Sequence, residues 1–527
     1  MQQTTFAMRK RMRSFVAVLS AVVLSLGLLT TSAFAADEST DSDAGANPRS
    51  LPLQLQDYGL SVAGVDVTSA NAADVLGDGT VSYDADTQTL VLDNAVIDYQ
   101  QGGDDNSKGA ILFNGDLNIE LIGENRITSA TCGVRALGSG DLVVTGGSLT
   151  VDAVYFGIGG ADSALNVTLS GVRLSVEVDV KSPFIASGIQ AGGQLSIVDD
   201  AHVDVAGAVA EAIPVVGNGG VLIKDSEVDA RVLADGQYGS GIIISDGEVV
   251  VDNSTVEVGT SNTYNFGILA GNDLTSSEGA IRIKNNSQVT ASSVAGMALW
   301  TMLGDIEIEN SLVAATSSGH DAIYAMGDIL IEGSADVTAS GPYPALVATG
   351  DIVIDPQGVL IDVWSGETEE DASRTTVLQP SQSLTFGTSD NYFRSAPHVH
   401  EFIERIADDA HVATAATCTD PAHYYFSCVC GEVGTDTFAS GDPLGHAFKD
   451  GACVVCGAED PDYMPLESPE QPSDQPADNE GEEEGSSALP ATGDAASPLA
   501  VAAFVSASLA GLVAIGAGML ARRRRNG

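Results

Sequence analysis

The sequence predicts an all-β protein built on a right-handed parallel β-helix, and three observations lead to this fold class. Glycine is frequent, with 58 of 527 residues, whereas aromatic residues make up only 5%. This composition favours many short strands joined by tight turns. A small residue or proline followed by apolar residues recurs every 23 to 31 residues between Gly109 and Ala345, which is a solenoid-like period. Inside most of these units, Gly-Asp precedes a segment of alternating apolar and polar residues.

The N-terminus carries the three parts of a secretory signal peptide. Four basic residues lie within residues 1–13, an apolar stretch runs from Ser14 to Leu29, and Ala33-Phe34-Ala35 supplies a cleavage site. We therefore expect residues 1–35 to be removed and residues 36–54 to form a flexible leader. An N-terminal membrane anchor is the alternative, but it would need a longer apolar span.

The net charge excludes one class of function. The chain has 22 basic and 72 acidic residues, and omitting residues 1–35 and 493–527 leaves 14 basic and 71 acidic residues, a balance of −57. Such a surface repels phosphate backbones, so we expect no nucleic-acid partner. The hydrophobic content of 44% still allows a sizeable core.

Residues 55–364 are expected to form the β-helix. In its entry segment, residues 55–100, Thr89 to Ile97 has the alternation of a half-buried strand. Each later unit holds about three short strands, and stacked units would bury a continuous core of Val, Ile, Leu and Ala. A β-propeller is the second choice, because its blades need about 40 residues each. The predicted units start at Gly109, Gly133, Gly157, Gly188, Pro214, Gly241, Gly267, Ala298, Ala322 and Ala345.

This region resembles the β-helical carbohydrate-binding domain of bacterial surface proteins. The resemblance rests on Asp78 to Asp84, on the Thr89 to Ile97 strand and on Ile119 to Asn125, and it covers more than half of the chain. It implies polysaccharide binding, with calcium in some members and without established catalysis.

Five aromatic residues are candidate sugar ligands, because each precedes a unit start by two to four residues. In the repeat frame they would gather along one edge of the solenoid, where aromatic faces suit the apolar faces of sugar rings. The alternative is that they cap the core at the loops. They are Tyr155, Phe184, Tyr238, Tyr264 and Tyr343.

Three aspartates in Gly-Asp turns are candidate calcium ligands. Asp305, Asp328 and Asp351 occupy equivalent positions in consecutive units. Coils about 4.8 Å apart would bring like charges together, and a calcium ion can bridge such carboxylates. The alternative, which the single ligand per coil favours, is that aspartate suits these turns and faces water.

A Cys/His-rich module, residues 398–458, follows a predicted connector at residues 365–397. Paired cysteines at two places are what a tetrahedral zinc site needs. The predicted ligand set is Cys428 or Cys430 with Cys418, Cys453 and Cys456, and His446 is a substitute. Gly445-His446-Ala447-Phe448 echoes His400-Glu401-Phe402, which suggests a small duplication.

The module resembles a short Cys/His-rich repeat of anaerobe surface proteins, through Thr417 to Pro421 and two Cys-Gly pairs. It departs from the usual knuckle because one residue, not two, separates Cys428 from Cys430. Disulfides, which secretion favours, and free thiols are the alternatives to zinc.

The C-terminal region has the features of a stalk followed by a localisation signal. Residues 459–488 are rich in Pro, Glu, Asp and Ser and should form a disordered acidic stalk. Residues 489–527 then combine a five-residue motif, an uncharged stretch from Pro498 to Ala521 and four arginines. As a helix, that stretch would be about 36 Å long, enough to cross a bilayer. The motif is Leu489, Pro490, Ala491, Thr492 and Gly493.

This order resembles the sorting signal of Gram-positive sortase substrates. The resemblance implies cleavage between Thr492 and Gly493, joining of the threonine carbonyl to a peptidoglycan amine, and membrane contact only before cleavage. A plain transmembrane anchor is the alternative. We thus expect a secreted, wall-attached protein that binds extracellular polysaccharide and is not an enzyme. The rivals are an adhesin for a protein partner and a polysaccharide lyase.

Overall fold

The computed structural model describes residues 55–101, 107–160, 165–178, 186–207, 212–232, 239–260, 265–271, 279–387 and 389–465. Strands and turns, without any helix, make up these residues, so no described helix is of a length and apolarity to cross a membrane. The predicted signal peptide, leader, sorting signal and most of the stalk lie outside the described residues.

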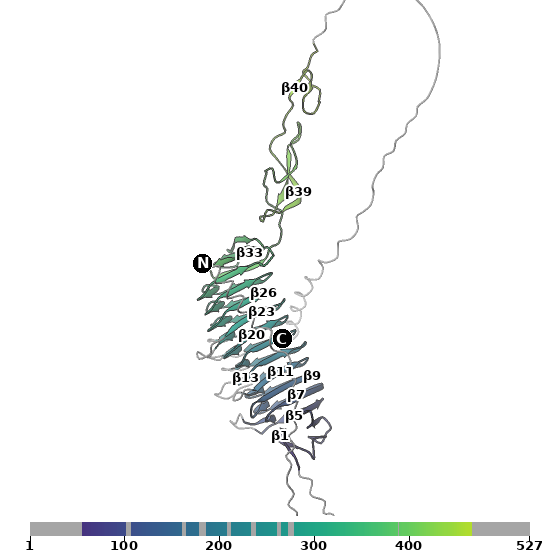
Figure 1. Cartoon of the computed structure of the whole chain (residues 1–527), viewed down its shortest axis with the longest axis vertical. Helices are drawn as coiled ribbons and strands as arrows, with labels where there is room; N and C mark the ends of the chain where they lie inside the picture. The colour runs from purple at the N-terminus through teal and green to yellow at the C-terminus, as the bar shows by residue number, and fades with distance from the viewer. Residues whose placement is uncertain are drawn as a thin grey trace, which may run out of the picture. The chain divides into compact units, whose positions relative to one another are not determined.

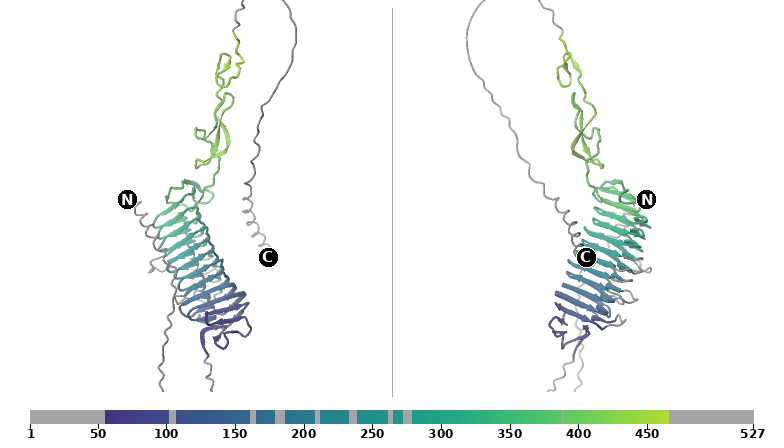
Figure 2. Two further views of the ribbon diagram at one scale, coloured as in Figure 1. Left: turned by 45° about the vertical axis from the view of Figure 1, so that its right-hand side comes forward. Right: turned by 180° about the vertical axis from the view of Figure 1, so that it is seen from behind.

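The described chain before the Cys/His module is a parallel β-solenoid of about nine turns (Figure 1). Its strands stack in register from coil to coil, and two other views show the same ladder (Figure 2). This confirms the all-β, parallel solenoid prediction.

One face of the solenoid is a twelve-stranded sheet that begins with an antiparallel pair, β1 (Asp57–Val62) and β2 (Val65–Thr68). Its other strands are β6 (Gly109–Phe113), β8 (Cys132–Ala136), β10 (Phe156–Gly159), β13 (Ala186–Ala191), β16 (Ala212–Gly217), β19 (Gly239–Ile244), β22 (Asn265–Ala270), β25 (Leu299–Thr301), β28 (Ile323–Ala325) and β31 (Leu346–Ala348).

Two further strands complete each coil, and in two early coils they run together as one long bent strand. The second-strand row is β4 (Thr89–Asp93), β7 (Leu117–Ser129), β9 (Gly140–Ala153), β11 (Leu165–Ser170), β14 (Leu195–Val198), β17 (Val221–Lys224), β20 (Glu248–Asp252), β23 (Ala280–Lys284), β26 (Ile306–Glu309), β29 (Ile329–Glu332) and β32 (Ile352–Asp355). The third-strand row continues β7 and β9 and adds β5 (Val96–Tyr99), β12 (Arg173–Val178), β15 (His202–Gly207), β18 (Glu227–Val232), β21 (Thr255–Thr260), β24 (Gln288–Ser293), β27 (Leu312–Ser317) and β30 (Asp336–Ser340).

The predicted repeat frame matches the observed register at every unit start but the first. Gly133 aligns with Gly157, and the alignment continues down the column to Ala345. At the first unit, Ile111 pairs with Val134, so Ala110 rather than Gly109 opposes Gly133. The predicted strand from Thr89 to Ile97 is also split, because Asn94 takes a positive φ of 51° between β4 and β5.

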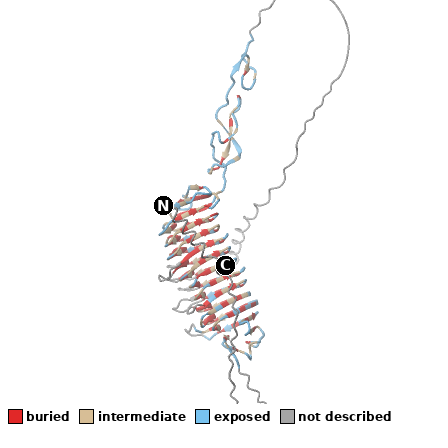
Figure 3. Cartoon of the chain, in the orientation of Figure 1, coloured by how far each residue is buried: buried red, intermediate tan, exposed pale blue. Residues whose placement is uncertain are grey.

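Buried residues run through the coils of the solenoid (Figure 3), alternating with more exposed residues in most second and third strands, and they form one continuous core. The unit-start positions are small because they face a third-strand residue across this core. A Cβ added to Gly157 would overlap Val176 and the carbonyl oxygen of Gly188 in the next coil. Beside Gly267, by contrast, the nearest core side chain is that of Ala291.

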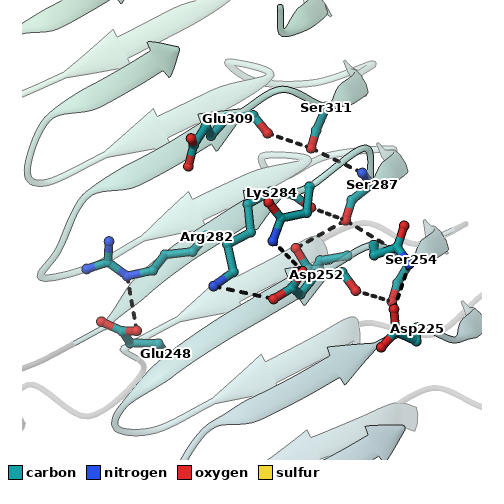
Figure 4. A network of polar contacts seen from close by, with 12 residues as sticks. Asp225, Glu248, Asp252, Ser254, Arg282, Lys284, Ser287, Glu309 and Ser311 are labelled. Carbon is teal, nitrogen blue, oxygen red and sulfur yellow. Dashed lines mark hydrogen bonds and ion pairs between the residues drawn. The ribbon is translucent and has the colours of Figure 1, made fainter. Parts of the chain in front are cut away.

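A buried ladder of serines closes the corner between the second and third strands (Figure 4). The N–H of Ser254 donates to Oγ of Ser287 at 3.2 Å, and the N–H of Ser287 donates to Oγ of Ser311 at 3.2 Å. Each hydroxyl in turn donates to a carbonyl two or three residues earlier, at 2.6 to 2.8 Å. The corner backbone therefore stays hydrogen-bonded although it is out of contact with water.

Replacing Ser287 with alanine should lower the free energy of unfolding by about 1–3 kcal/mol, because the N–H of Ser254 would lose its acceptor at a buried position. Urea denaturation followed by circular dichroism measures the change. The matched control is Ser334→Ala, since Ser334 is exposed. A Ser287→Ala protein as stable as the control would contradict the role of the ladder.

The predicted connector at residues 365–397 is instead the terminal cap of the solenoid. Strands β33 (Ile361–Gly366), β34 (Ser373–Leu378), β35 (Leu384–Phe386) and β36 (Tyr392–Pro397) all pair antiparallel. Strand β36 also pairs with β30, the last third strand of the parallel stack. A solenoid end exposes unpaired strand edges and apolar surface, so this segment folds over it.

Beyond the cap, the described chain forms short strands. They are β37 (Val412–Thr414), β38 (Ala422–Ser427), β39 (Val433–Ser440), β40 (Phe448–Lys449) and β41 (Ala452–Cys453). Contacts divide the chain into two compact units, and residues 424–438 belong with the unit that contains the solenoid. Within the described residues, the other unit comprises residues 414–423 and 439–465.

Candidate metal centres

Eight Cys and His side chains gather into two separate groups of four, each within one compact unit. The first, here the His398 site, is His398, His400, Cys428 and Cys430. The second, here the His446 site, is Cys418, His446, Cys453 and Cys456. In each group the four donor atoms lie within 4.8 Å of one another, so each can hold a metal ion.

Each site takes two donors from a tight turn that ends in glycine. At the His398 site the N–H of Gly431 donates to the carbonyl of Cys428 at 2.8 Å, and Gly431 has φ of 94°. At the His446 site the N–H of Gly457 donates to the carbonyl of Cys453 at 2.9 Å, and Gly457 has φ of 76°. Glycine adopts this left-handed conformation at little cost, which explains the two Cys-Gly pairs.

Backbone N–H groups of the turns also lower the pKa of one cysteine in each site. Burial raises the pKa of Cys428, but backbone N–H groups of Cys430 and Glu401 and the rings of His398 and His400 together lower it to about 6. The backbone N–H groups of Cys456 and Val455 lower the pKa of Cys453 to about 5, against burial. The thiolate is the form of cysteine that binds metal.

Two other cysteines, Cys418 and Cys430, resist ionisation. Burial raises the pKa of Cys418 to about 11, and the neighbouring Cys456 and Cys453 add to the effect. Burial likewise raises the pKa of Cys430, with Cys428 adding to it. Closely spaced thiols of this kind lose their protons readily only when a bound metal cation replaces the protons.

The distances fit tetrahedral metal coordination and not disulfides. Sγ of Cys418 lies 3.7 Å from Sγ of Cys453, whereas a disulfide would need about 2.05 Å. With zinc–sulfur bonds of about 2.3 Å, a tetrahedron separates two sulfurs by about 3.8 Å. Sγ of Cys430 lies 3.3 Å from Nδ1 of His400, and Sγ of Cys456 lies 3.3 Å from Nδ1 of His446.

The predicted echo between the two histidine segments is present as matching local geometry. The ring of His400 stacks on Phe402, with centroids 5.9 Å apart, and the ring of His446 stacks on Phe448 at 5.2 Å. Each site therefore combines a His-x-Phe segment with a Cys-Gly turn. The repeated His-x-Phe segment supplies one histidine to each of two sites, His400 to one and His446 to the other. The sequence interpretation had predicted a single site.

The predicted four-ligand set is wrong in its grouping. Neither Cys428 nor Cys430 joins Cys418, Cys453 and Cys456, because the chain folds them into different units. His446, predicted as a substitute, lies in the full ligand group of the second site. His398 and His400 were absent from the predicted ligand set, although both lie at the start of the predicted module, residues 398–458.

The calcium prediction at the Gly-Asp turns is not supported, because the carboxylates serve the backbone. Oδ1 of Asp305 accepts the N–H of Asp328 at 2.9 Å, and Oδ1 of Asp328 accepts the N–H of Asp351 at 2.9 Å. The preceding glycines make room for this contact, since a Cβ on Gly327 or Gly350 would overlap the carboxylate below. The motif is thus a coil-to-coil cap.

The predicted aromatic edge is only partly within the described residues. Phe184, Tyr238 and Tyr264 lie outside them. Tyr155 is 4% exposed and packs with Cys132 and Phe156, so its ring is not available to a sugar, which corrects the prediction for this residue. Tyr343 is 55% exposed, and its ring centroid lies 5.5 Å from that of His320.

An aromatic row that the sequence analysis missed lies on the outer side of the twelve-stranded sheet. Trp300 on β25 pairs in register with Tyr324 on β28, and both side chains are half-buried. The ring of Phe266 lies against Trp300 with centroids 4.5 Å apart. The signal was available, because Trp300 and Tyr324 each follow an inward-facing residue of the repeat by one position.

No family model, curated protein or solved structure matches this chain.

Proposed function

We propose that this chain is a wall-attached surface protein whose solenoid binds polysaccharide without catalysis and whose Cys/His module is held by two structural zinc ions. The observation that supports zinc is the pair of four-residue groups, Cys2His2 at the His398 site and Cys3His at the His446 site, each with donors within 4.8 Å. Both Cys2His2 and Cys3His, as closed tetrahedral sets, are typical of structural zinc. The short strands around these sites have little core of their own, and metal binding would supply folding free energy.

The polysaccharide proposal is supported by the outward aromatic row. Trp300, Tyr324 and Val347 are half-buried and occupy one register column on the outer side of the sheet, in which the next residue, Leu269, is buried. Outer positions exposed to water are ordinarily polar, so an apolar column with two aromatic rings favours a ligand that has apolar faces. Sugar rings have such faces, and the in-register rings offer a shallow surface rather than a deep pocket.

The net charge narrows the proposed ligand to neutral polysaccharides. The mature chain would carry about 57 excess negative charges, the balance of its 14 basic and 71 acidic residues. Anionic chains would be repelled at ordinary ionic strength, whereas neutral chains would not. Repetition along the solenoid would let a long glycan make several weak contacts at once.

The double variant Trp300→Ala/Tyr324→Ala should bind a neutral soluble glucan or xylan about 10- to 100-fold more weakly than the wild type. Affinity electrophoresis measures the binding, with product release monitored in the same samples. Leu312→Ala is the matched control, because Leu312 is a 47% exposed apolar residue on β27, a third-strand position.

One outcome would contradict the proposed binding surface, and two others would favour a different function. Unchanged glycan binding in the double variant would remove the aromatic row from the site. Unsaturated products released from a polysaccharide would support the lyase. A wild type that binds no glycan but binds a defined surface protein would support the adhesin, provided that the double variant no longer binds that protein.

A further inference from the structure

The His398 site has two Cys and two His where the His446 site has three Cys and one His, and it also has a carboxylate behind one of its histidines. Nδ1 of His398 lies 2.8 Å from Oδ2 of Asp362, and Nε2 of the same ring lies 3.1 Å from Sγ of Cys428. Within the described residues, neither His400 nor His446 has a carboxylate partner on its ring. The ring of His398 therefore connects the metal-binding group to a second element.

That element is the cap of the solenoid. Asp362 lies on β33, and its side chain is 3% exposed, while the side chain of His398 is fully buried. The N–H of His398 donates to the carbonyl of Leu360 at 2.8 Å, directly after β36 has paired with β33. Both the backbone and the ring of His398 are thus positioned by the cap.

The carboxylate of Asp362 is costly to bury unless it is paired on both sides. Nε of Arg374 on β34 lies 3.3 Å from Oδ1 of Asp362, and the guanidinium of Arg374 lies over the ring of Trp364 at 5.6 Å. Removing one partner of a buried pair leaves an uncompensated charge. Asp362 therefore ties together β33, β34 and the histidine.

A carboxylate on Nδ1 leaves the lone pair of Nε2 for a metal. An imidazole hydrogen-bonded in this way holds its tautomer and orientation, and it becomes a better metal ligand. The arrangement Arg374–Asp362–His398 thus leads from the cap to the metal-binding group.

We propose that Asp362 is a positioning residue that couples metal binding at the His398 site to the stability of the solenoid cap. This inference rests on the proposed function, because it takes the two Cys/His groups to be zinc sites. In it, zinc at the His398 site stabilises β33 and β36, and zinc at the His446 site does not.

The test uses the full chain with zinc, with zinc removed by a chelator, and with cobalt as a spectroscopic probe. In the wild type, removal of zinc should raise amide hydrogen exchange in β33 and β36 by at least about tenfold. Asp362→Asn should weaken one of two metal equivalents by about 10- to 100-fold, alter the cobalt spectrum of that site, and abolish the zinc dependence of exchange in the cap. Asp362→Glu should restore part of the affinity.

Two controls separate positioning from general destabilisation. Asp336→Asn removes another carboxylate of the cap region, which pairs with Arg394 at 3.2 Å, and it should leave both metal equivalents at wild-type affinity. Cys453→Ser should lose the other equivalent and keep the zinc-dependent protection of β33 and β36.

The possible results distinguish failure of the proposed zinc sites from failure of the coupling. A wild type that binds no zinc would overturn the proposed zinc sites and this inference with them. A wild type that binds two zinc ions, with Asp362→Asn binding both equally tightly, would overturn the coupling alone. Loss of cap protection in Asp336→Asn together with loss of metal affinity would assign the effect to general destabilisation and would also overturn the coupling.

Discussion

The purified chain should bind two equivalents of zinc, and Cys428→Ser and Cys453→Ser should each retain one. The two residues lie in different ligand groups, and each is the thiolate that its turn prepares. Loss of an outer-shell partner costs about 10- to 100-fold in metal affinity, so loss of a direct ligand should cost at least about 100-fold at that site. Metal analysis after gel filtration, combined with a thiol count, measures both quantities.

His423→Ala is the matched control for these variants. His423 lies on β38 but belongs to neither ligand group, so this variant should keep both equivalents. The double variant Cys428→Ser/Cys453→Ser should bind none. Metal-free protein in which the five cysteines of the module are oxidised would contradict the zinc sites and support the disulfide alternative.

Gly157→Ala should lower the free energy of unfolding by about 3 kcal/mol. The added methyl group would overlap Cγ1 of Val176 within its own coil and the carbonyl oxygen of Gly188 in the next coil. A packed core has no free volume for it, and a backbone atom cannot move without disturbing the stack, so the cost should reach the upper part of the usual overpacking range. Urea denaturation of the full chain, followed by circular dichroism, measures the change.

The size of the facing residue provides a sharper version of this experiment. Adding Val176→Ala to Gly157→Ala should recover about half of the lost stability, because one of the two overlaps disappears. Gly387→Ala is the control, since a Cβ at Gly387 meets no atom within 4 Å, and it should change stability by less than about 0.5 kcal/mol. A Gly157→Ala protein as stable as Gly387→Ala would contradict the packing argument.

This pairing of sizes explains why the unit starts vary along the chain. Gly133, Gly157 and Gly241 each face a valine of the third strand, at Val151, Val176 and Val258. Where third-strand residues of the same column are alanine, at Ala315 and Ala339, the corresponding unit starts are Ala298 and Ala322. The sizes therefore compensate in these five coils, whereas Gly267 and Ala291 are both small.

The sequence by itself determined the fold class, the number of strands in a coil and, with one exception, the register of the unit starts. These are properties of a single coil of about 25 residues, where apolar alternation and Gly-Asp turns act between near neighbours. The same local logic identified every cysteine of the metal-binding groups. It also located the Gly-Asp turns correctly, but its two alternatives for the carboxylates were calcium and water, whereas Asp305 and Asp328 accept the backbone N–H of the next coil.

Only the tertiary structure decided which residues meet across longer separations. His398 contacts Cys428, thirty positions later, and Asp362, thirty-six positions earlier, because β36 returns along the cap. The division of one Cys/His segment into two sites has the same origin, since eight donors can be grouped by fours in many ways. Nothing in the spacing of residues ranks these groupings; the path of the backbone selects one, because only donors within a few ångströms can share an ion.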